Sequence, residues 1–193
     1  MEPIFYPKRY SVILSFYIPW ILGIGRKTPE EAKKYIKYGE TLNPYYFPVL
    51  QEKIKEDGKE SVYKQYMQRL FNTNNIDDKL TKIIGEKVYK PWDCLSSIYQ
   101  IEINEKMALL ARPSGVTKNN ECIIMVDTFN DNYTSNTEEE LKIKLLSTMA
   151  VWKTKKGVYI IEKMNDKKIS INFDNAKWED ILCKIKLWSE KVV

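Results

Sequence analysis

The stretch KMALLARPSGVTKNNECIIMVDTF, residues 106–129, decides how this chain is expected to fold. It contains two apolar segments, Met107 to Leu110 and Cys122 to Val126, which a polar turn joins. A short unbroken apolar run between turn residues is typical of a strand buried on both faces. Asp127 ends the second run, and an unpaired buried charge is costly. We therefore expect a buried strand that ends at a carboxylate with a partner or a function.

Two motifs in this stretch resemble the catalytic core of the PD-(D/E)XK nucleases. Residues 111–116 (ARPSGV) are similar to the family's Gly-Arg-Pro-Asp-x-Val, and residues 126–129 (VDTF) to its Val-Glu-x-Lys. In that family two carboxylates hold Mg²⁺ or Mn²⁺, and a lysine orients or activates the attacking water. The resemblance places Ser114 at the first acid, Asp127 at the second and Phe129 at the lysine. It therefore implies a nuclease frame from which most of the chemistry is lost.

The remaining pattern predicts an α+β fold with the restriction-endonuclease-like αβββαβ core. We expect one domain over residues 1–193, with a mainly helical part over 1–90 and the sheet core and C-terminal helices over 91–193. One mixed sheet is expected from strands at 97–103, 106–111, 122–128 and 158–163. The expected helices include a buried one within 10–25, one from Thr28 to Tyr38, one from Pro44 to Gly58, one through Val62 and Leu70, one from Asp77 to Gly85, one behind a capping box at Thr137 to Glu140, and a last one from Asn175.

Within the superfamily, the chain resembles the RecB-like branch, in particular the CRISPR-associated exonucleases and their relatives in archaeal viruses. The branch's Gly-x-x-x-His motif falls on residues 39–43, with Asn43 at the histidine position. Its Gln-x-x-x-Tyr motif falls on Leu145 and Met149. The C-terminal cysteine group is reduced to Cys183. Because an iron–sulfur cluster normally takes four protein ligands, the resemblance implies that this chain holds none.

Composition excludes several kinds of chemistry. The 193 residues include no histidine, which excludes histidine-based triads and imidazole acid–base catalysis. The three cysteines, Cys94, Cys122 and Cys183, are far apart and form no CxxC pair, so we expect neither a disulfide framework nor a zinc site. This usage favours a reducing, cytoplasmic compartment. Residues 10–25 carry no charge, but Pro19 interrupts them and they are short for a span, so no membrane segment is expected.

Asp127 has two interpretations. It could hold a metal ion, with Glu102 or Asp131 as the second carboxylate of a migrated site and Glu121 also near in sequence. Alternatively, it caps backbone N–H groups or pairs with a lysine, and this is the interpretation we favour. No other metal ligand is expected.

Basic residues near the core strands are candidates for nucleic-acid contacts, namely Arg112, Lys118, Lys153, Lys155 and Lys156. The alternative is ordinary solvated turns, since the net charge is only +5 and lysines alternate with acids along most of the chain. Tyr45, Tyr46 and Trp92 could stack on bases, or pack beside the nearby prolines.

Three functions follow from these patterns. The first is a catalytically inactive nuclease homologue that binds DNA or a protein partner, such as a nuclease or CRISPR-type complex, in a viral setting. The second is an active metal-dependent DNA exonuclease with a site around Asp127. The third is a structural or packaging protein that reuses the fold. The sequence leaves the oligomeric state open.

Overall fold

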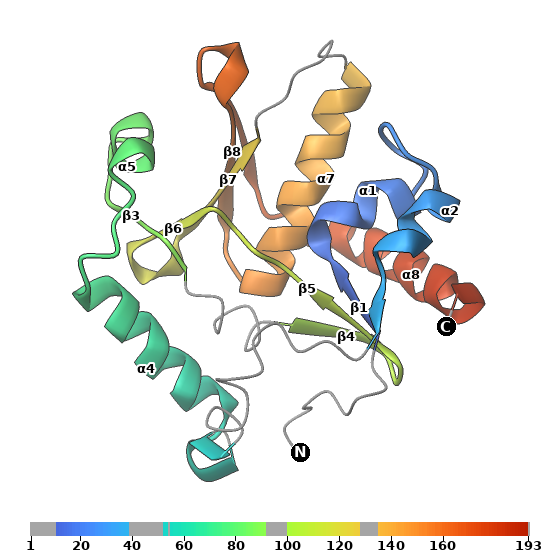
Figure 1. Ribbon diagram of the computed structural model, residues 1–193, viewed down its shortest axis with the longest axis horizontal. Helices are drawn as coiled ribbons and strands as arrows, with labels where there is room; N and C mark the ends of the chain where they lie inside the picture. Colours follow the sequence, from blue (N-terminus) through green and yellow to red (C-terminus); the bar gives the residue numbers. More distant parts are fainter. Residues whose placement is uncertain (1–10, 39–51, 54, 92–99, 128–134, 193) are drawn as a thin grey trace.

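The computed structural model describes residues 11–38, 52–53, 55–91, 100–127 and 135–192, and these build a mixed α+β fold with two sheets (Figure 1). Sheet A has the order β2–β1–β5–β4, and sheet B the order β3–β6–β7–β8–β9. The strands of sheet A are Lys37–Tyr38 (β2), Ser11–Leu14 (β1), Met107–Leu110 (β5) and Gln100–Asn104 (β4). Those of sheet B are Val88–Tyr89 (β3), Gly115–Thr117 (β6), Cys122–Asp127 (β7), Lys156–Ile161 (β8) and Lys167–Asn172 (β9). The predicted fold class is confirmed.

The stretch 106–129 joins the two sheets. It runs through β5 in sheet A, then β6, the short 3₁₀ turn η3 (Lys118–Asn120) and β7 in sheet B. The break falls at Pro113, which has no N–H with which to continue a β-ladder. The expectation of one central sheet is therefore wrong, because the four predicted strands are divided between two sheets. The predicted burial of β7 is confirmed, with Ile123 and Ile124 fully buried.

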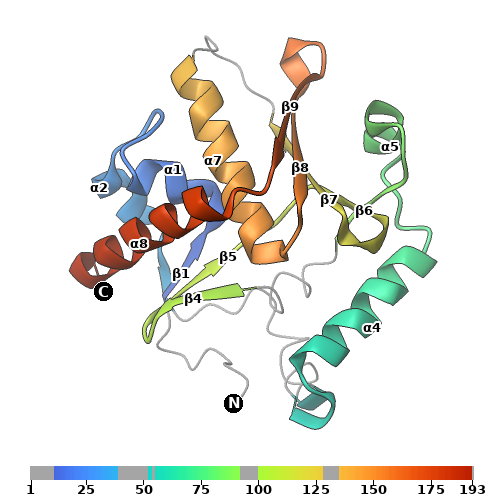
Figure 2. The same ribbon diagram turned by 180° about the vertical axis from the view of Figure 1, so that it is seen from behind.

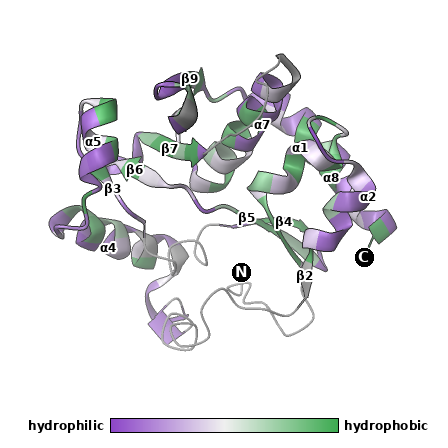
Figure 3. Cartoon of the chain, turned by 45° about the horizontal axis from the view of Figure 1, so that its top comes forward, coloured by the Kyte–Doolittle hydropathy of each residue, from purple (hydrophilic) through white to green (hydrophobic). Residues whose placement is uncertain are grey.

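Helix α7 (Ser135–Trp152) lies at the centre of the molecule (Figures 1 and 2). It packs against β7 and β8 on one side and against α1 (Ile18–Ile21) and α8 (Asn175–Val192) on another. Gly157 at the start of β8 permits close packing, since a Cβ there would lie 2.7–2.9 Å from atoms of Leu145 and Met149. Both of these side chains are fully buried. Figure 3 shows apolar residues along α7 and the strands beside it.

Helix α5 (Asp78–Ile84) covers the other face of sheet B. Its Leu80 belongs to a second apolar cluster with Val88, Ile124 and Ile160. Helix α4 (Lys59–Asn72) lies on the same side of the molecule as α5 (Figure 1). Sheet B is thus covered by α7 on one face and by α5 on the other.

The N-terminal segment departs from the helix expected within residues 10–25. Residues 11–14 form β1, which pairs in parallel with β5 from Ser11 opposite Met107 to Leu14 opposite Leu110. A 3₁₀ turn, η1 (Ser15–Tyr17), and α1 follow. Pro19 stands in the first turn of α1, where its missing N–H removes no helical hydrogen bond. Within the uncharged segment Ile13, Ile18 and Trp20 are buried, but its first part is a strand and not the expected helix.

Of the helix starts predicted from capping residues, those at Thr28 and Asp77 are confirmed and the one at Thr137 is not. The box at Thr28 is confirmed, with the Glu31 N–H donating to the Thr28 hydroxyl, but α2 (Pro29–Ala32) then passes into a 3₁₀ turn, η2 (Lys33–Tyr35), and β2. The predicted helix to Tyr38 is therefore too long. For α5 the expectation is confirmed, because Asp77 accepts the Leu80 N–H at 2.9 Å and Gly85 ends the helix at a φ of 87°. The box predicted at Thr137 is wrong, since α7 already begins at Ser135.

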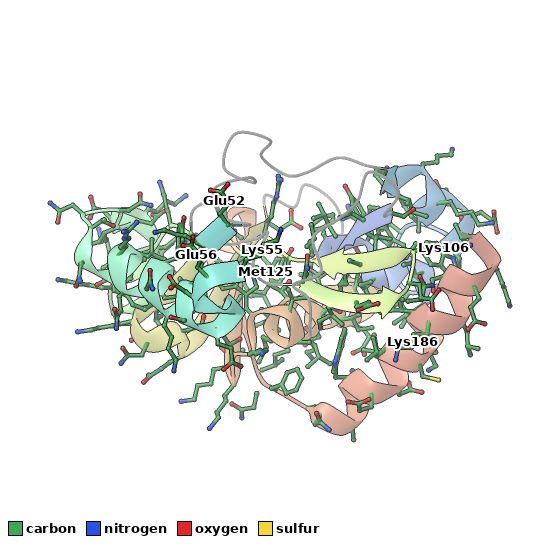
Figure 4. The ribbon with its side chains drawn as sticks, turned by 90° about the horizontal axis from the view of Figure 1, so that it is seen from below. Glu52, Lys55, Glu56, Lys106, Met125 and Lys186 are labelled. Atoms are coloured by element: carbon green, nitrogen blue, oxygen red, sulfur yellow. The ribbon has the colours of Figure 1, made fainter. Side chains whose placement is uncertain are left out.

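The C-terminal part follows the expected order. Helix α8 buries Trp178, Ile181 and Ile185, and its Ser189 accepts a hydrogen bond from the Asn104 side chain at 2.7 Å. Figure 4 places Met125 of β7 in the middle of the molecule and Lys106 and Lys186 at its edge beside sheet A. Among the described residues, no helix is both long and apolar enough to cross a membrane. That residues 1–193 form one domain stays a prediction.

Candidate functional site

Asp127 ends β7 opposite Ile161 of β8. Alternation along the strands puts its side chain on the face that α7 covers, together with Met125 and Tyr159. The Tyr159 hydroxyl donates to the Asp127 carboxylate at 3.2 Å. Burial, and the carboxylate beside it, raise the pKa of the Tyr159 hydroxyl far above its ordinary value, so it remains a donor. The structure thus gives Asp127 a hydrogen-bonded partner inside the protein.

Ser114, at the position of the family's first acid, lies beside the same end of β7. Its backbone N–H donates to the Ile124 carbonyl at 2.9 Å, and its hydroxyl accepts the Val126 N–H at 3.1 Å. The hydroxyl therefore satisfies a backbone donor where the β6–β7 ladder ends. A neutral hydroxyl already used in this way is a poor ligand for a hard divalent cation.

Two charged residues that the motif comparison did not identify lie on the neighbouring helix. Glu140 and Lys144 of α7 are both fully buried, and Lys144 Nζ lies 2.7 Å from Glu140 Oε1. The ammonium also lies 3.7 Å from the centroid of the Phe16 ring, a cation–π arrangement. Burial lowers the pKa of Lys144, whereas Glu140 and Asp127 act to raise it. The two carboxylates therefore share the field of one buried ammonium.

The N-terminal segment closes over Glu140. Its carboxylate accepts hydrogen bonds from Trp20 Nε1 at 3.3 Å and from the Arg26 backbone N–H at 3.2 Å. This approach requires Gly25, whose φ is 98° and where a Cβ would lie 2.1 Å from Glu140 Oε2. The Arg26 guanidinium adds a second positive group, with Nε at 3.9 Å. We refer to Arg26, Asp127, Glu140, Lys144 and Tyr159 as the charged cluster.

The other acids proposed for a migrated metal site do not join this cluster. Glu102 is exposed on β4 in sheet A, opposite Ala108. Glu121 precedes β7 and so lies at the end opposite Asp127. Within the described ranges, no group of three or more potential metal-ligating side chains occurs. Other candidates lie outside the described residues, namely Asn43, Tyr45, Tyr46, Trp92, Cys94, Phe129 and Asp131.

Four of the five basic candidates gather at the far end of sheet B. Lys156 begins β8 opposite Cys122, and Lys153 and Lys155 precede it. Lys118 lies in η3, which is tied to the end of α7 because the Asn120 side chain donates to the Trp152 carbonyl at 2.8 Å. We call Lys118, Lys153, Lys155 and Lys156 the lysine end. All four are exposed, and none forms an ion pair with another described residue.

The lysine end borders a hollow on the α5 face of sheet B. Its volume is about 400 Å³, and its lining includes Glu86, Cys122, Lys156, Lys168, Ser170 and Asn172. Five residue steps along β7 separate Cys122 from Asp127, or about 17 Å at 3.3 Å each. Arg112 is exposed and lies two residues before Ser114, close to the Asp127 end. The predicted basic contacts therefore divide between the two ends of the strand.

Leu145 and Met149 stand at the positions of the family's Gln and Tyr. Both lie on the buried face of α7 and pack against Gly157. Glu140 and Lys144 had one signal in the sequence, a spacing of four residues on the predicted helix, which also carries Lys142 between them. Such a pair normally lies on a solvated helix face. Its burial here follows from contacts with residues 16–26, far away in the sequence.

Comparisons with known proteins give similarity in structure only. No protein-family model matches the sequence, and no curated protein matches it. An alkaline exonuclease from Laribacter hongkongensis superposes with a TM-score of 0.48 and 11% identity, covering 93% of this chain and 87% of that chain. A phage-related exonuclease from Haemophilus somnus 129PT gives a TM-score of 0.45 and 15% identity, covering 93% of this chain and 92% of that one.

Proposed function

We propose that this protein is an inactive homologue of the PD-(D/E)XK nucleases, of the RecB-like type, that binds nucleic acid without cleaving it. One observation carries the proposal. Four exposed lysines that form no ion pair with another described residue lie at one end of β7, and the retained acid of the motif, Asp127, lies at the other end in contact with Tyr159.

The surroundings of Asp127 argue against metal-dependent hydrolysis. A cation that activates water for attack on a phosphodiester is normally held by two or more oxygen ligands. Here the Ser114 hydroxyl accepts a hydrogen bond from a backbone N–H. The Glu140 carboxylate accepts hydrogen bonds from the Trp20 side chain and the Arg26 backbone and forms an ion pair with Lys144. Lys144 is fully buried, so its ammonium cannot reach a substrate phosphate.

The lysine end supports binding. Exposed lysines that form no ion pair with the described carboxylates attract a phosphate backbone, and binding releases the counterions that surround it. The adjoining hollow, which Lys156 also lines, adds Lys168 as a cation and Ser170 and Asn172 as hydrogen-bonding groups, and Glu86 is the carboxylate in its lining. Because contacts between lysines and phosphates carry no sequence information, we expect affinity that is modest and independent of sequence. The proposed setting is the cytoplasm, including that of a virus-infected cell.

The binding experiment compares labelled single- and double-stranded DNA at low salt by fluorescence anisotropy. The test variant neutralises Lys153, Lys155 and Lys156 by substitution with Gln. The control neutralises Lys177, Lys184 and Lys191 on α8, and so makes the same change in net charge elsewhere. We expect weaker binding by the first variant only. Equal loss in both variants would show that net charge, not the lysine end, drives binding.

The cleavage experiment incubates the protein with both DNA forms in Mg²⁺ or Mn²⁺. We expect no cleavage. Cleavage by the parent that disappears in Asp127→Ala would instead establish an active exonuclease with Asp127 as a catalytic residue. Undetectable DNA binding at low salt, together with no cleavage, would favour a protein partner, such as a nuclease or CRISPR-type complex, or a structural and packaging role.

A further inference from the structure

The charged cluster holds more buried charge than the folding of a small domain normally tolerates. Glu140 and Lys144 are each fully buried, and transfer of both ions from water is costly. Hydrogen bonds to the carboxylate offset part of this cost. Both Glu140 oxygens are used, one by Trp20 and Lys144 and the other by the Arg26 backbone. The pair is therefore a built feature of the interior.

Lys144 is held differently from an ordinary ion-paired lysine. Its nitrogen lies 2.7 Å from Glu140 Oε1, yet it makes no well-angled hydrogen bond within the described residues. The ring centroids of Phe16 and Trp20 lie 3.7 Å and 5.6 Å from it. The ammonium is thus held by charge and by aromatic rings, as a bound cation would be.

The Lys144 ammonium pairs with Glu140, and α7, which carries both residues, packs against β7, the strand that ends at Asp127. Glu140 lies one turn earlier on α7, and Asp127 ends the strand that α7 covers. Burial lowers the pKa of Lys144, whereas Glu140 and, less strongly, Asp127 favour its charged form. Arg26, the other cation of the cluster, lies at its exposed edge and favours the neutral form. Lys144 is therefore the buried counter-charge of Glu140, and its positive charge also lies on the side of β7 on which Asp127 hydrogen-bonds to Tyr159.

We propose that the Lys144 ammonium takes the electrostatic place of a divalent cation between β7 and α7, and that the protein consequently binds no divalent cation there. The donor set agrees, because the Ser114 hydroxyl and the Glu140 oxygens are used internally. A divalent cation entering beside the ammonium would meet like charge at low dielectric. The inference deepens the proposed function, since it gives a physical reason for the absence of cleavage.

The proposal predicts that removing the ammonium creates a cation requirement. Lys144→Met keeps the length of the side chain and removes the buried counter-charge of Glu140, which leaves only the Arg26 guanidinium at the exposed edge of the cluster. We expect its Tm to fall by roughly 10 °C in metal-free buffer, because breaking a buried pair leaves a charge uncompensated. Mn²⁺ or Ca²⁺ at 100 times its Kd should then raise the Tm of the variant by about 5 °C or more, while the Tm of the parent stays unchanged.

Three controls isolate the charge. Lys144→Arg retains a cation and should show no response to metal. Glu140→Gln/Lys144→Met removes both buried charges, and should recover stability and lose most of the response. KCl at matched ionic strength should not replace Mn²⁺. The amplitude of the free Mn²⁺ signal in electron paramagnetic resonance should report one bound ion per Lys144→Met chain and none per parent chain.

Each result of these measurements either supports or overturns the proposal. A parent that binds Mn²⁺ through Asp127, or a folded Lys144→Met that shows no metal response, overturns the proposal. If Lys144→Met fails to fold alone, refolding in Mn²⁺ but not in KCl supports it. Failure in both, while the double variant folds, overturns it. DNA cleavage by a parent that binds no Mn²⁺ at Asp127 would contradict the proposed function and leave this inference standing.

Discussion

At the scale of single residues, the two described cysteines should differ sharply in reactivity. Cys122 is buried and Cys183 is exposed, and burial raises the pKa of the Cys122 thiol to about 11. Because the thiolate is the reactive form, we expect a disulfide reagent at neutral pH to modify Cys183 quickly and Cys122 only after unfolding. The measurement uses a Cys94→Ser background, with Cys183→Ser as the matched control. Rapid loss of both thiols in the folded protein would contradict it.

The same thiol links stability to pH. Its pKa is raised in the folded state from an ordinary value of 9.0, so the folded protein favours the neutral thiol. This contribution is fully present below pH 9 and is lost as the pH rises through about 11. The free energies of unfolding of the parent and of Cys122→Ala, measured with denaturant, should therefore converge as the pH rises over this window. A difference that stays constant between these pH values would show that the thiol does not titrate there.

Gly25 provides a second residue-scale prediction with an internal control. Both Gly23 and Gly25 have positive φ, at 71° and 98°, but only at Gly25 would a Cβ collide with Glu140. Gly23→Ala should cost about 1 kcal/mol of backbone strain. Gly25→Ala should cost clearly more, at least about 2 kcal/mol, because it also displaces the carboxylate that Lys144 needs. Equal losses in chemical denaturation would mean that the turn does not hold Glu140.

At the scale of elements, α7 should behave as the core of the molecule. Leu145 is fully buried against Gly157, so Leu145→Ala should lower the free energy of unfolding by about 2–5 kcal/mol. Leu187 on α8 is exposed, and Leu187→Ala should change it by less than about 0.5 kcal/mol. DNA affinity of the folded Leu145→Ala variant should equal that of the parent. A selective loss of DNA binding would instead give Leu145 the positioning role of the family's Gln.

The elements that were predictable have local signals. The apolar run of β7, the Asp77 cap and Gly85 stop of α5, and the apolar stripe of α8 each depend on neighbouring residues. The errors in sheet organisation, unlike the local ones at Thr137 and after Thr28, have non-local causes. Strand β1 forms because it pairs with β5, almost a hundred residues later. The division into two sheets likewise depends on the interruption of the strand at Pro113, between β5 in one sheet and β6 in the other.

The same limit applies to the candidate site. Asp127 and Ser114 could be identified from motif spacing, because strand neighbours keep that spacing. Glu140 could not, because its burial depends on a backbone N–H that is 114 residues away in the sequence. A Glu and a Lys four residues apart look like a solvated pair in any helix. Only the fold shows that α7 is covered on both sides.

At the scale of the whole molecule, the segregation of charge predicts how DNA binding depends on salt. Each lysine that neutralises a phosphate contributes about −0.9 to the slope of log K against log salt on duplex DNA. If Lys153, Lys155 and Lys156 all contact phosphates, their substitution with Gln should reduce that slope by about 3. The α8 control variant of Lys177, Lys184 and Lys191 should keep the parent slope, although it has the same net charge as the variant of Lys153, Lys155 and Lys156. Adding Asp127→Ala to the parent should leave the slope unchanged as well, because the lysine end lies about 17 Å along β7 from that carboxylate. A slope that falls in the α8 variant, or in Asp127→Ala, would place the nucleic acid elsewhere on the molecule.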